Sequence, residues 1–333
     1  MQSGILTNSA FLNLLKFLLK MLNRRHIRIK VMQSIYAMQQ NGNDNLEAQE
    51  KFLLNSLENV QDLYLTLMSI FIELKKNESI HLDLISKKHL ATPEERNPNK
   101  KFVNNKVLQL LEENDSLSNA LSARKINAFE LKNDFILILL KDIKESDLYK
   151  NYMADATNSF ENDKQFIELL FEELIASSDK FYEYIEDYKL TWVDDLALVN
   201  TLVLKQLKAF KNQANAYYVP RLYRDAEDKE YAQALFRKTV LNSSELEKEF
   251  VNKTNNWDAD RIAEIDTIIL KLAICEFLKF PSIPVKVTIN EFLELAKEYS
   301  TKKSSIFING ILDNLVKDYT NNKRLIKTGR GLM

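Results

Sequence analysis

The chain has 333 residues, and its five glycines and five prolines are far below the average usage of about 7% and 5%. This shortage of turn-forming residues predicts an all-α protein, long enough for two domains. The formal net charge of −1 excludes attraction of nucleic acid by the charge of the whole chain. The single cysteine, Cys275, excludes an internal disulfide and fits a reducing, cytoplasmic compartment.

Residues 1–22 contain an apolar run, Phe11–Leu19, that is interrupted by Asn13 and Lys16. The run is shorter than the roughly 20 apolar residues that span a bilayer. It also lacks the basic residues ahead of the run and the small-residue cleavage site behind it that a signal peptide needs. We expect 1–22 to be an N-terminal extension without membrane association. Since Met21 opens a sequence that reads like a natural start, residues 1–20 are expected to lie upstream of the true start.

Residues 23–45 begin with a cluster of cations, formed by Arg24, Arg25, Arg28 and Lys30. An apolar stripe (Ile27, Val31, Ile35, Met38) predicts an amphipathic helix behind them. Cations at a helix N-terminus oppose the macrodipole, so helix stability does not explain them. Two interpretations are open: a solvated charged face, or arginine forks that bind phosphate.

The long region 46–225 is predicted to be a series of helices. Helices are expected at Leu46–Lys76, Phe102–Glu112, Leu117–Lys125, Phe129–Lys144 and Lys164–Asp187, with a loop at Ala91–Lys101. Acidic residues on the last helix form a surface that would repel RNA, which favours an RNA site elsewhere.

Part of this region resembles a later part of the chain. At one constant offset, Asp163 aligns with Asp228 and Trp192 with Trp257. Either 163–205 is a degenerate repeat of 228–271, or two helical segments rich in Lys, Glu and Leu are similar by chance. Because Asn200 stands where Asp266 stands in the second copy, no second site is expected in the first.

Residues 226–320 carry the most regular pattern. Residues 262–278 are apolar nearly all round, which predicts a buried central helix. Two amphipathic helices follow within 283–313, and Ser304 or Ser305 is expected to cap the second. Gly310 lies inside that helix, which indicates either a close helix crossing or the approach of a ligand.

The C-terminal stretch resembles the signature of the transcription antitermination factor NusB family. The matching residues, in order and without a gap, are Pro284, Lys286, Val287, Ile289, Asn290, Glu291, Leu295, Ala296, Lys297, Ser304, Phe307, Asn309, Gly310, Leu312 and Asp313. Trp257, Arg261 and Asp266 resemble the family's central helix, and Arg24-Arg25-x-x-Arg28 with Gln33 and Tyr36 resembles its first helix.

The resemblance implies a helical bundle assembled from 23–45 and 226–320, with 46–225 inserted and a basic, flexible tail at 321–333. It implies an RNA-binding factor that holds boxA-type ribosomal RNA together with the small-subunit ribosomal protein NusE, acting with RNA polymerase and other Nus factors in ribosomal RNA transcription. Carried over by position, the RNA-binding residues are Arg24, Arg25, Arg28, Lys30, Gln33, Lys303 and Phe307, and the partner-binding residues are Tyr36, Asp266 and Glu291. A core position is an equally good interpretation of Phe307.

Lys302-Lys303 stand where the family commonly has acidic residues, which favours phosphate and puts the ribosomal-protein interface in doubt. No metal-ligand spacing, phosphate loop or nucleophile motif occurs, so we expect neither an enzyme nor a cofactor. The alternative function is a helical protein–protein scaffold without specific RNA binding.

Overall fold

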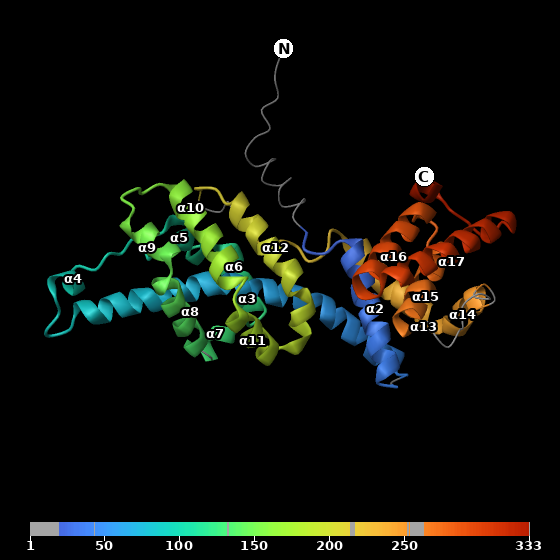
Figure 1. The fold of residues 1–333 in the computed structure, drawn as a ribbon, viewed down its shortest axis with the longest axis horizontal. Helices are drawn as coiled ribbons and strands as arrows, with labels where there is room; N and C mark the ends of the chain where they lie inside the picture. The colour runs from blue at the N-terminus through green and yellow to red at the C-terminus, as the bar shows by residue number, and fades with distance from the viewer. Residues whose placement is uncertain are drawn as a thin grey trace, which may run out of the picture. The chain divides into compact units, whose positions relative to one another are not determined.

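The computed structural model describes residues 20–42, 44–131, 133–213, 217–251, 253 and 263–332. Within these ranges the chain forms helices and no strand, apart from one parallel bridge between Lys20 and Arg221, so the predicted all-α class is confirmed. The chain divides into two compact units (Figure 1): unit 1 holds 20–21 and 58–222, and unit 2 holds 22–57 and 223–332. Residues 1–19, Trp257 and Arg261 lie outside the described residues. No described helix is long and apolar enough to cross a membrane.

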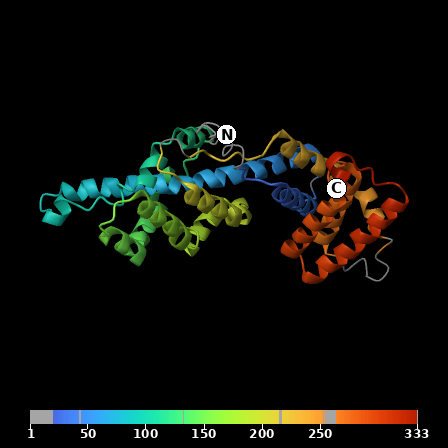
Figure 2. The same cartoon turned by 90° about the horizontal axis from the view of Figure 1, so that it is seen from above.

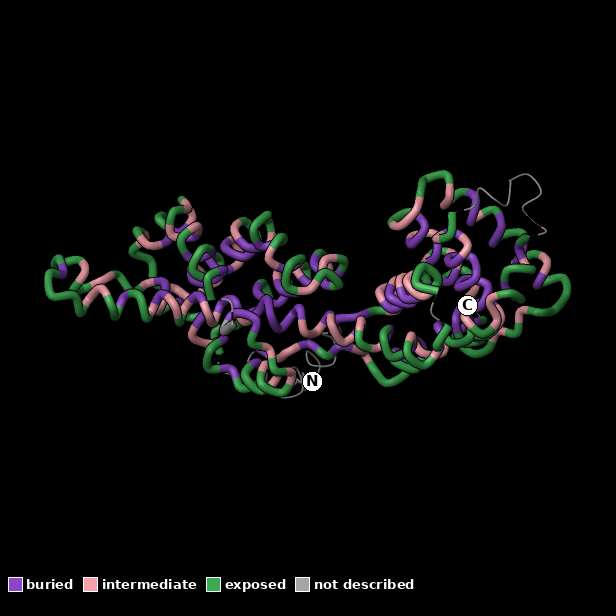
Figure 3. The backbone as a smooth tube through the Cα atoms, turned by 90° about the horizontal axis from the view of Figure 1, so that it is seen from below, coloured by how far each residue is buried: buried purple, intermediate pink, exposed green. Residues whose placement is uncertain are grey.

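Unit 1 is built around the long helix α3 (Leu46–Ser86), whose residues from Glu58 onward belong to it. Its other helices are α4 (Pro93–Arg96), α5 (Lys106–Glu112), α6 (Asp115–Ala123), α7 (Ala128–Leu131), α8 (Asn133–Glu145), α9 (Asp147–Ala154), α10 (Phe160–Leu169), α11 (Asp179–Tyr188) and α12 (Val193–Ala209). The middle of α3 is buried, as Figure 3 shows, because its apolar stripe faces these helices. The Phe71 ring on α3, for example, lies 6.0 Å from that of Phe171.

Polar contacts fix α3 to its neighbours in unit 1. The Lys144 ammonium donates to both carboxylate oxygens of the buried Glu78, at 2.8 and 2.9 Å. The buried hydroxyls of Tyr64 and Tyr217 share a hydrogen bond of 2.9 Å. These groups are satisfied inside the unit, as buried polar groups must be to avoid a desolvation cost.

Several predicted elements of unit 1 differ from the structure. The helix expected at Leu46–Lys76 continues to Ser86 as α3. The single helix expected at Lys164–Asp187 is interrupted: α10 runs into a π-helical turn (Leu170–Ile175), and the Ser178 side chain then caps α11. The loop expected at Ala91–Lys101 contains α4, because Thr92 and Glu95 form a reciprocal capping box around it.

Unit 2 packs its helices around α15 (Glu264–Lys279). The surrounding helices are α2 (Arg24–Gln40), α13 (Ala226–Leu241), α14 (Ser243–Val251), α16 (Val285–Tyr299) and α17 (Lys302–Asn321). Every residue of α15 from Ile268 to Phe277 is buried, which confirms the predicted central helix. Each fully buried Leu or Ile contributes roughly 1.5–3 kcal/mol, so α15 anchors the unit.

Helices α16 and α17 lie side by side, as Figures 1 and 2 show, and the expected N-terminal cap of α17 was wrong. Its N-terminus is capped by Thr301, whose hydroxyl accepts from the Ser304 amide at 3.1 Å, and not by Ser304 or Ser305. Gly310 is exposed, and a Cβ there would meet nothing within 4 Å, so no close helix crossing explains it.

Candidate nucleic-acid interface

The first two turns of α2 carry the arginines that the sequence singled out, Arg24, Arg25 and Arg28. The Asn23 side chain caps the helix by accepting from the His26 amide at 3.0 Å, and His26 Nδ1 accepts the Asn23 amide in return. No acidic residue lies in this first turn. The charge of the arginines is therefore compensated from other helices.

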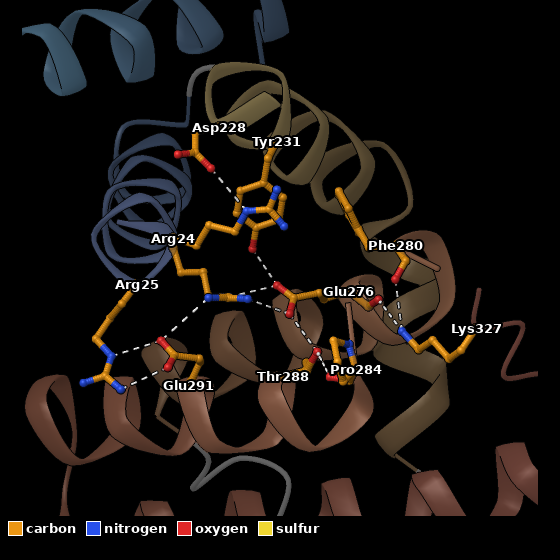
Figure 4. Close-up of polar contacts among 11 residues, drawn as sticks. Arg24, Arg25, Asp228, Tyr231, Glu276, Phe280, Pro284, Thr288, Glu291 and Lys327 are labelled. Atoms are coloured by element: carbon orange, nitrogen blue, oxygen red, sulfur yellow. Dashed lines mark hydrogen bonds and ion pairs between the residues drawn. The ribbon is translucent and has the colours of Figure 1, made fainter. Parts of the chain in front are cut away.

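Arg28 lies inside unit 2 and not on its surface. Its side chain is 2% exposed and donates two hydrogen bonds, at 2.9 and 2.8 Å, to the fully buried carboxylate of Glu276 on α15. The Tyr231 and Thr288 hydroxyls donate to the same carboxylate, at 2.5 and 2.7 Å (Figure 4). Burial lowers the pKa of Arg28, but Tyr231 and Glu276 raise it by more, so the guanidinium stays charged. The prediction that Arg28 contacts RNA disagrees with this placement, because a satisfied buried fork is closed to phosphate.

Arg24 and Arg25 remain partly accessible. The Arg25 side chain is 41% exposed. Its Nε and Nη2 atoms each donate a 3.0 Å hydrogen bond to the Glu291 carboxylate of α16, and this contact raises the pKa of Arg25. Arg24 donates at 3.3 Å to the buried carboxylate of Asp228, and its guanidinium carbon lies 4.9 Å from the centre of the Tyr231 ring (Figure 4). Both arginines thus keep donors free to meet an anion beside their acidic partners.

A cleft of about 640 Å³ opens at this corner of unit 2. It is lined by Asn23, Arg24, Arg25, His26, Arg28, Glu227, Ser282, Ile283, Pro284, Val287, Glu291 and Arg330. The N-terminus of α16 faces it, and no side chain caps that terminus. Uncapped amides and the positive end of a helix favour an anion, and the arginines add full positive charge.

The C-terminal tail contributes Arg330 to this cleft. Lys327 donates to the carbonyl oxygens of Glu276 and Phe280, at 3.3 and 3.1 Å, and so caps the end of α15. The Thr328 amide donates to the Pro281 carbonyl at 3.0 Å. Gly331 packs so closely that a Cβ there would lie 2.0 Å from the Pro281 oxygen. The tail was expected to be flexible, and instead residues 327–331 lie docked in a defined path.

The other predicted site residues are spread over unit 2. Lys30, Asp266 and Phe307 are buried, at 6, 4 and 8% exposure, and Gln33 is half-buried. Phe307 therefore sits in the core, the alternative already open from the sequence, where it is closed to base stacking. Lys303 and Tyr36 are exposed. The structure thus brings Arg24, Arg25 and Glu291 together in the cleft and leaves Lys303 and Tyr36 on the surface.

Sequence patterns did not identify Arg330 or Glu276 as important. Arg330 was recognised as one of several basic tail residues, and only the docking of Gly331 against Pro281 brings it to the cleft. Glu276 gave the weak signal of an acidic residue inside an apolar helix.

Burial raises the pKa of Cys275 to about 11, which keeps this thiol protonated. In the described part of the chain, no cluster of His, Cys, Asp and Glu could hold a metal ion.

Comparison with known proteins gives a consistent result. The NusB family model matches residues 197–317. Proteins named transcription antitermination protein NusB are 40% identical over 109 residues in Salinibacter ruber, 37% over 109 residues in Chloroherpeton thalassium and 43% over 91 residues in Clostridium kluyveri. These alignments cover 33, 33 and 27% of this chain and 68, 52 and 58% of the relatives. No solved structure matches.

Proposed function

The chain belongs to the NusB family, and from that premise we propose that it is an RNA-binding transcription antitermination factor. The family domain in this proposal is unit 2, in which α2 joins the helices α13 to α17 although most of unit 1 separates them in the sequence. The ligand is boxA-type single-stranded RNA of ribosomal transcripts. The partners are the ribosomal protein NusE and, through it, RNA polymerase and other Nus factors.

The cleft at the start of α2 carries this proposal. Arg24, Arg25 and Arg330 supply cationic donors there, next to the uncapped N-terminus of α16. Charge-assisted bonds from arginine forks and backbone amides are how proteins hold RNA phosphates. The exposed Tyr36 and Lys303 are proposed to contact the partner protein and RNA, respectively, outside the cleft.

A protein–protein scaffold remains the second candidate function, since one observation favours it. Arg24, Arg25 and Arg28 each pair with a carboxylate of unit 2, so much of their charge is compensated within the protein. A scaffold would keep these pairs for stability and would bind its protein partner without RNA.

Fluorescence anisotropy with labelled boxA-type RNA separates the two functions. We expect the protein to bind this RNA more tightly than a scrambled RNA. We also expect the ribosomal partner to tighten binding of the boxA-type RNA and not of the scrambled RNA. Equal, weak binding of both RNAs that is indifferent to the partner would contradict the antitermination proposal and favour the scaffold.

The docked tail makes a separate prediction. Arg330→Gln removes one cleft cation, and Gly331→Ala displaces the tail because its Cβ clashes with the Pro281 oxygen. Each is expected to weaken RNA binding about tenfold, the size of one lost charge-assisted hydrogen bond.

Lys323→Gln is the matched control, because it removes one exposed charge from the same tail outside the cleft. Anisotropy titration of the three variants measures the effect. If Lys323→Gln weakened binding as much as Arg330→Gln, the tail would act by general charge and not through its docked position.

A further inference from the structure

Unit 1 contains a second polar cleft that the proposed function does not use. Its volume is about 780 Å³, within the range of about 300–1,000 Å³ that holds small-molecule ligands, so it has room for a nucleotide and not only for a phosphate. The cleft lies at the starts of α5 and α10 and at the end of α9, which are neighbours in Figure 1. From its lining we propose that this cleft is a second binding site for single-stranded RNA.

Three lysines supply the positive charge of the cleft. Lys100 and Lys106 are exposed, and their contacts are weak or local: the Lys100 ammonium lies 3.8 Å from Asp83, and the Lys106 ammonium donates to Gln109 at 3.1 Å. Lys101 is held in place, since its ammonium donates to the Asp155 carbonyl at 2.6 Å and lies 4.4 Å from the centre of the Tyr152 ring. Flexible lysines beside a fixed one can follow the phosphates of a single strand.

The two carboxylates of the cleft are engaged within the protein. Asp163 is 7% exposed, and its oxygens accept from the Tyr152 hydroxyl at 2.6 Å and from the Lys106 amide at 2.8 Å. Asp155 accepts from the Thr157 amide at 2.8 Å and the Asn162 side chain at 3.0 Å, and these amides lower its pKa. These donors fill part of the acceptor capacity of each carboxylate, and the three lysines of the lining outnumber the two carboxylates.

The remaining lining suits nucleobases. Phe160, the first residue of α10, is half-buried and lines the cleft, where its ring offers a stacking surface for a base. The exposed residues Asn104 and Asn158 also line the cleft, and their side-chain amides can meet base edges as donors or acceptors. Lysines, an accessible ring and free amides together favour single-stranded RNA over an acidic peptide, which has no use for a stacking surface.

The position of this cleft parallels that of the cleft in unit 2. In unit 1, Asn105 caps α5, the Lys106 amide donates to Asp163 in the first turn of α10, and α10 packs against α5 and α12. In unit 2, Asn23 caps α2, Arg24 donates to Asp228 in the first turn of α13, and α13 packs against α2 and α15. Asp163 and Asp228 are the residues that the proposed repeat aligns, so this likeness supports a duplication in which both corners bind RNA.

The sequence argued against a site in the first copy because Asn200 replaces Asp266. Neither residue lines its unit's cleft, so that difference does not bear on this site. The inference rests on the proposed function for the choice of RNA as ligand, and it adds a binding site on a different unit.

The test uses the full chain and a short, unstructured single-stranded RNA. Native mass spectrometry counts the RNAs bound per chain, and anisotropy at several salt concentrations gives affinity. The double variant Lys100→Gln with Lys106→Gln is expected to remove one of two bound RNAs. It should also make the slope of log affinity against log salt concentration smaller by about 1.4, because two phosphate contacts are lost. Phe160→Leu is expected to lower the affinity for the RNA bound in unit 1 about tenfold. The control is the double variant Lys87→Gln with Lys141→Gln, which removes two exposed charges outside the cleft and is expected to leave binding unchanged.

Arg24→Gln with Arg25→Gln, expected to remove the other RNA, separates the failures. If a single RNA binds and is lost only in this arginine variant, the second site does not exist and the proposed function stands. If the only RNA is lost with the lysine variant, the second site stands and the cleft of unit 2 is overturned. If neither variant changes binding, both are overturned. Displacement of the unit 1 RNA by poly-glutamate at equal charge concentration would also overturn the inference, in favour of an acidic protein.

Discussion

Replacing Arg28 with alanine is expected to lower the free energy of unfolding by about 3–5 kcal/mol, because it leaves the Glu276 carboxylate buried without its cation. The Tyr231 and Thr288 hydroxyls would still donate to that carboxylate, but they carry no charge to balance it. Urea unfolding followed by circular dichroism measures the loss.

Two comparisons identify the cause of this loss. Arg25→Ala breaks a partly exposed pair and is expected to cost less than about 1 kcal/mol. Arg28→Met combined with Glu276→Gln removes both charges and is expected to cost less than the sum of the single substitutions. Were Arg28→Ala to leave stability unchanged and abolish RNA binding, Arg28 would be a surface ligand of RNA, as its sequence position suggested.

Arg25 and Glu291 are expected to change RNA affinity in opposite directions. Arg25→Gln removes a hydrogen-bond donor to phosphate and should weaken RNA binding about tenfold. The slope of log affinity against log salt concentration should become smaller by about 0.7, because one phosphate contact is lost. Glu291→Gln removes the acidic side chain that competes for the Arg25 fork, at 3.0 and 3.0 Å, and should tighten binding several-fold, by about 1 kcal/mol.

Anisotropy titrations of both variants at two salt concentrations provide the measurement. Glu294→Gln is the control, since Glu294 is an acidic residue of the same helix that lies outside the cleft and accepts a 2.7 Å hydrogen bond from Lys297. Weaker RNA binding by Glu291→Gln would show that Glu291 orients Arg25 and does not compete with RNA. It would then count as a positioning residue of the site.

Local patterns predicted the helices well, because each pattern is complete within a few turns. The apolar stripe of α2 and the nearly all-apolar α15 are readable from their own residues. Breaks between helices were harder to place, since they depend on single hydrogen bonds. Ser178 caps α11 and Thr301 caps α17, whereas several serines and threonines nearby were equally plausible caps.

The amino-acid sequence alone therefore determined the helical class, the resemblance to the NusB family and the cluster of arginines near residue 24. Which of those arginines face solvent was decided by the tertiary structure, because Arg28 and Glu276 are far apart in the chain and meet only when α2 packs on α15. The same holds for Arg330, whose place in the cleft depends on the close contact of Gly331 with Pro281. The sequence shows where a charged residue stands, but it does not show which residue neutralises that charge. The partner, and therefore the availability of the charge to RNA, depends on how helices from distant segments pack together.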